Sequence, residues 1–385
     1  MKYPSHIELS RKALTQNIRY LRRRIGPRAE FTSVIKGNAY GHGLRPFLKL
    51  AEDCDVRSFA VSDAYEASLA LEVKRPESRL MIMGLVDDVE VEWAVVNDVE
   101  FWVFEFGRLE TAVETAGRLG KPARIHLEVE TGMNRTGFER TDWERVADYL
   151  RDNRDRLELR GICTHYAGAE SVANYLRILN QYQRFKEAVE FFAERDLVFD
   201  QRHTACSAAA LTYPQTIMDT VRFGIAQYGF WPSRETRMYN LLSDDTRFTI
   251  DPLRRVLSWK SKVMSLKRVP PGEFVSYGTS CLADRHLRLA VIPVGYRHGF
   301  SRSLSNLGHV LIRGRKAPVR GLVNMNMFLV DVGHIHGVRK GDEVVLIGRQ
   351  KRQAISVSSF SDLAKHVNYE LLTRLPAETP RLIMD

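Results

Sequence analysis

Apolar segments alternate with amphipathic ones through roughly the first 230 residues, at a spacing of about 25–30 residues. The apolar segments are short and bounded by turn residues, which is typical of buried strands, and segments such as 63–73 and 174–195 have helical spacing. The predicted strands are 31–36, 58–62, 80–84, 100–104, 124–130, 158–165, 201–205 and 220–223. Repeated strand–helix units predict an α/β fold with a closed (β/α)8 TIM barrel. A doubly wound open sheet is the alternative, but no Gly-x-Gly-x-x-Gly opens a helix here.

The pattern changes after residue 232, where short apolar segments follow one another without a long helix between them. Strands are predicted at 273–277, 287–293, 309–313, 328–332 and 342–347. This spacing predicts a mainly antiparallel β domain. A helical pattern at 359–375 follows it.

We divide the chain at these changes of pattern. Residues 1–10 contain an opening strand, 6–9, that can pair with the β domain; residues 11–235 form the barrel; and residues 236–385 form the C-terminal domain. The polar stretch 233–251 is the expected linker.

Composition narrows the class of protein. The chain of 385 residues is long enough for a large core and a second domain, and no apolar run reaches the roughly 18–20 residues that a bilayer requires. The first residues lack the apolar core of a signal peptide. The cysteines (Cys54, Cys163, Cys206, Cys281) lack metal-binding spacing, so we expect a cytoplasmic protein with neither disulfides nor a metal site.

The chain has a formal charge of +10, which raises the question of a nucleic-acid partner. Its arginines are spread along the chain, and the densest group, 22–24, lies in an amphipathic pattern with Leu14, Ile18 and Leu21. That arrangement predicts the solvated face of a helix rather than a nucleic-acid surface. A positive field would instead favour small anions.

The segment 34–43, Val-Ile-Lys-Gly-Asn-Ala-Tyr-Gly-His-Gly, carries the most distinctive chemistry. Burial at a strand end lowers an ammonium pKa, so Lys36 is suited to act as a Schiff-base amine. The glycines after it allow backbone N–H groups to approach an anion. A solvated surface lysine is the alternative interpretation of Lys36 alone.

Other polar residues occur at the predicted carboxyl ends of barrel strands, where barrel enzymes build their sites. They are Glu128, Arg135, His165, Ser207 and Arg222, with Gly224 and Ile225 just beyond. Each alone could be structural: a core histidine, a buried ion pair or a helix cap. Their common placement indicates one site, and the loops after the last two strands are common phosphate sites.

Segment 34–43 resembles the cofactor-lysine motif of alanine racemases, enzymes that use pyridoxal 5′-phosphate, and the resemblance extends over nearly the whole chain. It implies that Lys36 binds the cofactor covalently. Arg222, in Val-Arg-Phe-Gly-Ile-Ala, would face the cofactor's ring nitrogen and weaken the electron sink, with His165 beside it. Tyr40, Ser207, Gly224 and Ile225 would hold the phosphate.

The resemblance continues in the β domain. Tyr277, in Val-Ser-Tyr-Gly-Thr, would be the second catalytic base, and Tyr296 would face the substrate channel. The Met325 backbone N–H and Arg135 would bind the substrate. In the family these β-domain groups enter the partner subunit's site, so the resemblance implies a homodimer with shared active sites.

The chain departs from the family pattern at several positions. Glu128 stands where many members have a carbamylated lysine, and we expect it to orient Arg135 as a built-in carboxylate. Asn324 and Asn326 stand where many members have Cys and Asp. Ala377 replaces a tyrosine that some members place over the substrate methyl group, which predicts a wider pocket.

The resemblance implies a racemase that interconverts L- and D-alanine and supplies D-alanine for peptidoglycan. A broader racemase for serine, lysine, ornithine or arginine is the nearest alternative. A decarboxylase on the same plan would use a negative partner for the ring nitrogen, which Arg222 disfavours. A non-catalytic cofactor-binding protein would resemble the barrel alone, without Tyr277 and its domain.

Overall fold

The computed structural model describes residues 3–243, 251–357 and 368–385. The chain divides into two compact units. The barrel unit comprises residues 13–37 and 48–254, and the β unit comprises the residues up to Lys12, Asn38–Phe47 and Arg255–Asp385. Each unit therefore contains segments that lie far apart in the sequence.

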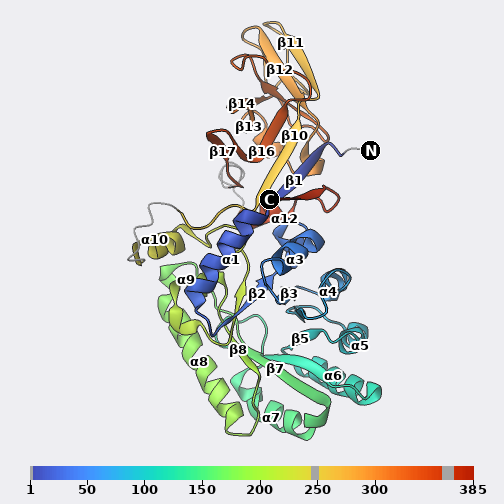
Figure 1. The fold of residues 1–385 in the computed structure, drawn as a ribbon, viewed down its shortest axis with the longest axis vertical. Helices are drawn as coiled ribbons and strands as arrows, with labels where there is room; N and C mark the ends of the chain where they lie inside the picture. Colours follow the sequence, from blue (N-terminus) through green and yellow to red (C-terminus); the bar gives the residue numbers. More distant parts are fainter. Residues whose placement is uncertain (1–2, 244–250, 358–367) are drawn as a thin grey trace. The chain divides into compact units, whose positions relative to one another are not determined.

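The barrel unit is built on parallel strands with helices between them (Figure 1). The strands, in chain order, are β2 (Glu30–Val34), β3 (Ser58–Val61), β4 (Arg79–Ile82), β5 (Glu100–Val103), β6 (Ala123–Glu128), β7 (Leu157–Cys163), β8 (Gln201–His203) and β9 (Thr220–Phe223). Each pairs with the strand before it from β3 to β8, and β9 pairs with β2. The Arg222 N–H donates to the Ala205 oxygen at 3.0 Å, which joins β9 to the segment after β8 and closes the barrel. The predicted (β/α)8 barrel is confirmed.

Helices connect these strands as the apolar pattern predicts. They are α1 (Arg11–Ile25), α3 (Leu44–Glu52), α4 (Ala64–Leu71), α5 (Asp88–Val96), α6 (Phe106–Leu119), α7 (Trp143–Asp152), α8 (Tyr175–Ala193), α9 (Ser207–Thr212) and α10 (Arg234–Ser243). Leu14, Ile18 and Leu21 of α1 are buried, whereas Arg23 is exposed, so the arginine-rich stretch is a helix face, as predicted. Part of the predicted linker is helical, as α10.

The β unit contains a mainly antiparallel sheet. Its strands are β1 (Ser5–Ser10), β10 (Leu257–Lys262), β11 (Ser265–Val269), β12 (Leu287–Ile292), β13 (His309–Ile312), β14 (Arg315–Arg320), β15 (Phe328–Asp331), β16 (Glu343–Gln350), β17 (Gln353–Ile355) and β18 (Arg381–Met384). The sheet order is β11-β12-β15-β14-β13-β16-β10-β1-β18, and β17 pairs with β16. The opening strand β1 pairs antiparallel with β10 and parallel with β18. The described part of the predicted C-terminal helix is α12 (Asn368–Thr373); residues 358–367 lie outside the described residues.

The strand predicted at 273–277 is wrong. Only an isolated bridge, Phe274 to Leu282, forms there, and Ser276 and Gly278 have φ values of 67° and 66°. Two left-handed residues on either side of Tyr277 cannot belong to an extended strand. The segment is a loop, although its apolar–polar alternation is strand-like.

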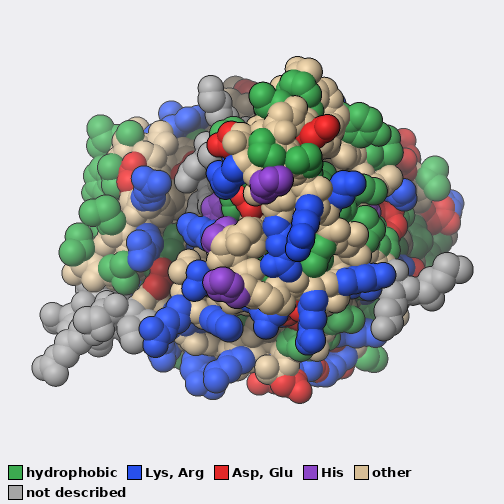
Figure 2. Space-filling model, turned by 90° about the horizontal axis from the view of Figure 1, so that it is seen from above, with side chains coloured by type: hydrophobic (Ala, Val, Ile, Leu, Met, Phe, Trp, Pro, Cys, Tyr) green, Lys and Arg blue, Asp and Glu red, His purple; other side chains and the backbone are tan. Residues whose placement is uncertain are grey.

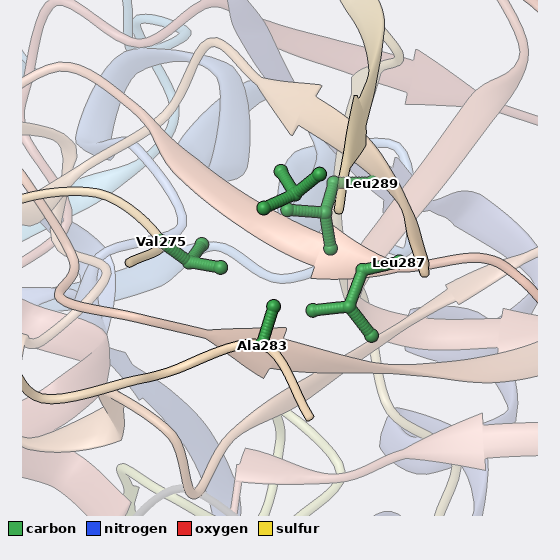
Figure 3. Packing of buried hydrophobic residues seen from close by; sticks show 5 residues of the cluster. Val275, Ala283, Leu287 and Leu289 are labelled. Carbon is green, nitrogen blue, oxygen red and sulfur yellow. The ribbon is translucent and has the colours of Figure 1, made fainter. Parts of the chain in front are cut away.

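A small apolar cluster anchors this loop (Figure 3). Val275 and Ala283 face Leu287 and Leu289 of β12, and Val275 is 2% exposed. Val275 also donates its N–H to the Cys281 oxygen at 2.8 Å. Tyr277 therefore lies two residues from a point that is fixed by packing and by a backbone hydrogen bond.

The positive charge is distributed rather than concentrated on one element. Lysine and arginine side chains lie across much of the face shown in Figure 2, with acidic and hydrophobic side chains between them. In the described ranges, no helix has the length and apolar character needed to cross a bilayer.

Candidate active site

Lys36 lies just beyond the carboxyl end of β2. The strand ends at Val34, and Ile35 still donates its N–H to the Ala60 oxygen at 2.8 Å, so the lysine is placed by the sheet. By surface area the residue is exposed, but neighbouring protein atoms still displace much of the water around its ammonium group. Partial burial of the ammonium, followed by the positive charge of Arg135, lowers its pKa, and Arg222 acts in the same direction. A lowered pKa increases the fraction of neutral amine, which is the nucleophilic form.

The segment after Lys36 forms a left-handed helical turn. Asn38, Ala39 and Tyr40 have φ values of 53°, 53° and 51°, after Gly37 at 62°. Left-handed residues other than glycine cost roughly 1–2 kcal/mol each. A run of them is unusual, and strained backbone of this kind is often found at functional sites.

Arg222, on β9, is 3% exposed and is held at both terminal nitrogens. Its Nη1 donates to the His203 oxygen at 2.7 Å and to His203 Nδ1 at 2.6 Å. Its Nη2 donates to the Thr164 and Thr204 oxygens at 2.9 and 3.1 Å. A guanidinium has five N–H donors. The Nε–H is the one without an acceptor in the described part of the barrel unit.

His165 lies beside this arginine, two residues after β7 ends at Cys163. Its Nδ1 is 3.5 Å from Arg222 Nη2, and its backbone oxygen accepts from Gln181 Nε2 at 3.0 Å. Burial and then the charge of Arg222 lower the pKa of His165 to about 3. The ring is therefore neutral at physiological pH, so it can accept a hydrogen bond as well as donate one.

Ser207 and the loop after β9 meet at the end of the barrel. The Ser207 Oγ accepts from the backbone N–H groups of Gly224 and Ala226 at 3.1 and 3.4 Å. Ile225 is 5% exposed, and its N–H finds no acceptor in the described part of the barrel unit. An N–H without a protein acceptor at this end of the barrel fits an anion that the protein binds.

Glu128 and Arg135 differ in their surroundings. Glu128 ends β6 and is 3% exposed, and its Oε2 has no hydrogen-bond partner in the described residues. Arg135 is exposed. No hydrogen bond or ion pair joins these two described side chains, although the charge of Arg135 lowers the pKa of Glu128 against the larger, raising effect of burial. The orienting role of Glu128 stays a prediction.

In the β unit, Asn324 connects the segments that carry the remaining candidates. Its Oδ1 accepts from Ser276 Oγ at 3.3 Å, next to Tyr277, and its backbone oxygen accepts from the Tyr296 N–H at 3.1 Å. Met325 follows Asn324 directly. Tyr277, Tyr296 and Met325 are 71%, 42% and 52% exposed, so the unit presents all three at its surface. Tyr40 also belongs to this unit, and its backbone oxygen accepts from His42 Nδ1 at 3.0 Å.

Sequence reasoning missed a buried polar group behind Arg222. His203 Nε2 lies 2.8 Å from His126 Nδ1, and His126 Nε2 lies 2.9 Å from Glu100 Oε2. The signal was weak, since Glu100 begins β5, His126 lies within β6, and His203 ends β8, whose sequence is Gln-Arg-His. Nothing in the spacing indicated that the three would meet.

A separate pocket lies in the barrel unit, at the amino end of β2. Arg22 and Arg57 are among its lining residues. It contains none of the candidate residues, and Arg22 donates to the Asp55 oxygen at 2.7 Å. This pocket is therefore not part of the candidate site.

Comparisons with known proteins agree over the whole chain. Residues 9–232 match the family model "Alanine racemase, N-terminal domain", and residues 256–383 match "Alanine racemase, C-terminal domain". An alanine racemase of Leptospira interrogans is 33% identical, covering 100% of this chain and 96% of that protein. A crystal structure of the alanine racemase from Bacillus anthracis with bound L-Ala-P is 28% identical, with a TM-score of 0.90, covering 100% of this chain and 96% of that chain. The alanine racemase structure from Streptomyces coelicolor is 31% identical with a TM-score of 0.88, covering 99% and 98%. This chain belongs to the alanine racemase family.

Proposed function

We propose that this protein is a pyridoxal 5′-phosphate-dependent racemase that interconverts L- and D-alanine. The observation that carries the proposal is the placement of Lys36 and Arg222 at two neighbouring barrel strands. A lysine of lowered pKa follows the end of β2, and a buried guanidinium with a single unengaged N–H lies on the neighbouring strand β9. Membership in the family is the reason to expect racemisation, and Lys36 and Arg222 are the residues with which this chain would carry it out.

The residues fit the cofactor. The lowered pKa of Lys36 favours the neutral amine that covalent attachment needs, and a ring nitrogen would supply an acceptor for the Arg222 Nε–H. Ser207, Gly224 and Ile225 would hold the phosphate, with the unpaired Ile225 N–H as a direct donor, and Tyr40 would add a hydroxyl. When bound, the cofactor would act as the electron sink that makes the α-proton of the substrate acidic.

Racemisation requires proton transfer on opposite faces of the α-carbon, and we assign these roles to Lys36 and Tyr277. The lowered pKa of Lys36 favours its neutral amine, which is the form that can take a proton. A tyrosine has a reference pKa of about 10, so Tyr277 needs positive charge or hydrogen bonds nearby in the assembled site. One residue removes the α-proton and the other returns one, and the enantiomer that binds decides their order.

Substrate binding and assembly complete the proposal. Arg135 and the Met325 N–H would bind the substrate carboxylate, and Tyr296 would line the approach to the site. Large side chains such as Tyr277 and Met325 are more than half exposed in the single chain. This exposure supports a homodimer in which each subunit completes the site of the other. We also expect a cytoplasmic location.

A broader racemase is the second candidate, and Ala377 favours it. Alanine has little bulk where some family members have a tyrosine, so serine or a longer side chain could enter. The choice between these candidates depends on relative rates, which a substrate panel measures.

The test is to incubate the purified protein, reconstituted with pyridoxal 5′-phosphate, with single L-amino acids and to measure each D-enantiomer by chiral chromatography. D-alanine should form fastest. Lys36→Ala should lose both activity and the visible absorption of the bound cofactor. Lys49→Ala, at an exposed lysine of α3, is the matched control and should keep both. Absence of any D-amino acid from the wild-type protein would refute the proposal.

A further inference from the structure

A line of buried polar side chains crosses the interior of the barrel behind Arg222. It consists of Arg222 on β9, His203 on β8, His126 on β6 and Glu100 on β5, and we call it the Arg222–Glu100 network. The hydrogen-bond distances along it are 2.6, 2.8 and 2.9 Å. None of the four residues is more than 6% exposed. Such a line is costly to bury unless every member is satisfied.

The network can run in only one direction. A guanidinium donates hydrogen bonds and never accepts them, so His203 Nδ1 must be unprotonated where it meets Arg222 Nη1. The His203 proton is then on Nε2 and is donated to His126 Nδ1. His126 in turn carries its proton on Nε2 and donates it to Glu100. The low pKa of His203, caused by burial and then by the charge of Arg222, agrees with a neutral ring.

The far end of the network is an anion. Burial raises the pKa of Glu100, but the hydrogen bond from His126 and the charges of Arg79 and Arg160 lower it. Glu100 Oε1 also lies 3.4 Å from Arg160 Nε. A carboxylate can only accept, so it fixes which nitrogen of His126 carries the proton.

The lack of a side chain at Gly161 leaves room for the contact between His126 and His203. A Cβ added at Gly161, on β7, would lie 2.3 Å from His126 Nδ1 and 3.0 Å from His203 Nε2. The backbone of Gly161 does not have a positive φ, so the glycine is explained by space alone. A metal site is not an alternative explanation, since no metal-binding group of His, Cys, Asp or Glu occurs in the residues described.

We infer that Glu100 and His126 are positioning residues for Arg222. They act through His203: the carboxylate sets the tautomer of His126, which sets that of His203, which leaves Nδ1 free to accept from Arg222. If the tautomers were reversed, His203 Nδ1–H would face Arg222 Nη1–H, and two donors would repel each other. The inference rests on the proposed function, because the position of Arg222 matters to the reaction through the ring nitrogen that its Nε–H would meet.

The first experiment measures tautomers and does not depend on activity. The holoenzyme is labelled with 15N-histidine, and the ring nitrogens of His126 and His203 are assigned by the signals lost in His126→Gln and His203→Gln. Both wild-type rings should be neutral, with the proton on Nε2. A proton on Nδ1 of either ring overturns the inference, whether or not the protein is a racemase.

The second experiment removes the charge of Glu100. In Glu100→Gln the amide can donate as well as accept, so only Arg222 still holds the direction of the network, and the reversed tautomers should appear as a minor population at both histidines. Loss of a partner behind a site residue typically lowers activity about 10–100-fold, by analogy with metal-site partners. We expect a fall of about tenfold or more in racemisation, with more turnovers that convert the cofactor to its amine form.

Glu52→Gln is the matched control. Glu52 is also buried, at 2% exposed, and accepts from Ser78 Oγ at 2.6 Å, but it makes no contact with the network. It should leave three quantities unchanged: the rate of racemisation, the share of turnovers that convert the cofactor to its amine form, and the histidine tautomers. If Glu100→Gln alters the tautomers but keeps the wild-type rate and the wild-type share of turnovers that convert the cofactor to its amine form, the positioning role is overturned. If Glu100→Gln fails to fold, the wild-type tautomer measurement still decides the inference.

Discussion

Replacing Glu128 by glutamine separates the stability of the barrel from the function of the site. The side chain is 3% exposed and its Oε2 is unpaired, so the carboxylate is poorly solvated. Burial raises its pKa above the ordinary value of 4.5, although Thr136 and the charges of Arg135 and Arg222 oppose that effect. Glutamine keeps the shape and removes the charge.

The direction of the change in the free energy of unfolding follows from the linkage between protonation of Glu128 and folding. The folded-state pKa is higher than the unfolded one, so above pH 4.5 the folded state holds its proton more tightly. The free energy of unfolding therefore falls as the pH rises through the interval between the two pKa values. Glu128→Gln removes this loss, so its urea midpoint should exceed the wild-type midpoint at neutral pH. The difference should shrink near pH 4, where the wild-type carboxyl is largely protonated in both states.

The structure also sets the size of the functional effect. A buried ion pair that loses one partner costs roughly 3–5 kcal/mol, which would lower kcat/KM by a factor of about one hundred to several thousand. Arg135 is exposed and makes no ion pair with Glu128, so the coupling should resemble that of a surface pair, about 0–1 kcal/mol. We therefore expect kcat/KM to fall about fivefold at most.

The assay is kcat/KM for L- and D-alanine, together with urea unfolding at both pH values. Glu114→Gln, at an exposed position of α6, is the control and should change neither quantity. Added bicarbonate should affect none of the proteins, because no lysine is available at position 128 for carbamylation. A loss of more than about a hundredfold in kcat/KM would mean that Glu128 contacts Arg135 directly in the working enzyme. A lower urea midpoint at neutral pH would refute the stability reasoning.

Three further predictions concern the β unit. Tyr277→Phe should slow racemisation of the two enantiomers unequally, by about 10²–10⁴-fold in the step that uses the phenol, which solvent-deuterium incorporation into each enantiomer reports; equal, unchanged turnover would remove Tyr277 from the mechanism. Gly295→Ala should destabilise the unit, because the new Cβ would lie 2.1 Å from the Asn324 oxygen; a thermal midpoint equal to that of the wild type would show that the backbone can move aside. Burial holds the pKa of His42 at about 3, below its unfolded value of 6.5, so this ring stabilises the unit above pH 6.5 and the stability is lost on acidification towards pH 3. Between pH 6.5 and about 5 this one group should remove about 1.5 kcal/mol, measurable as the difference in urea unfolding between the wild type and His42→Asn, and a zero difference contradicts the assignment.

Local pattern was enough to predict the barrel and the placement of its polar residues. The repeated segments located every barrel strand to within a few residues. Most of these strands are largely apolar, because a parallel strand is buried on both faces, but β8 is Gln-Arg-His. The carboxyl ends of such strands meet at one rim, so the sequence predicts that Lys36, Glu128, His165 and Arg222 lie at the same end of the barrel. The motif around Lys36 then supplied the family, which the comparisons confirm.

Local pattern failed where backbone conformation overrides periodicity. The alternation at 273–277 indicates a strand, but positive φ at Ser276 and Gly278 turns the segment into a loop that exposes Tyr277. The left-handed turn over Gly37 and the residues to Tyr40 was equally unforeseen, since alanine and tyrosine, unlike glycine and asparagine, rarely adopt that conformation.

The sequence by itself therefore determined the strand–helix order, the polar rim of the barrel and the family motif around Lys36, all of which depend on neighbours within a few residues. Only the tertiary structure decided which buried groups share hydrogen bonds. His126 and His203 are separated by 77 positions, and Glu100 and His126 by 26, yet they meet because the closed sheet brings their strands into register. Hydrogen-bond direction along that network depends on a guanidinium at one end and a carboxylate at the other, and barrel closure is the physical step that places both on the same line.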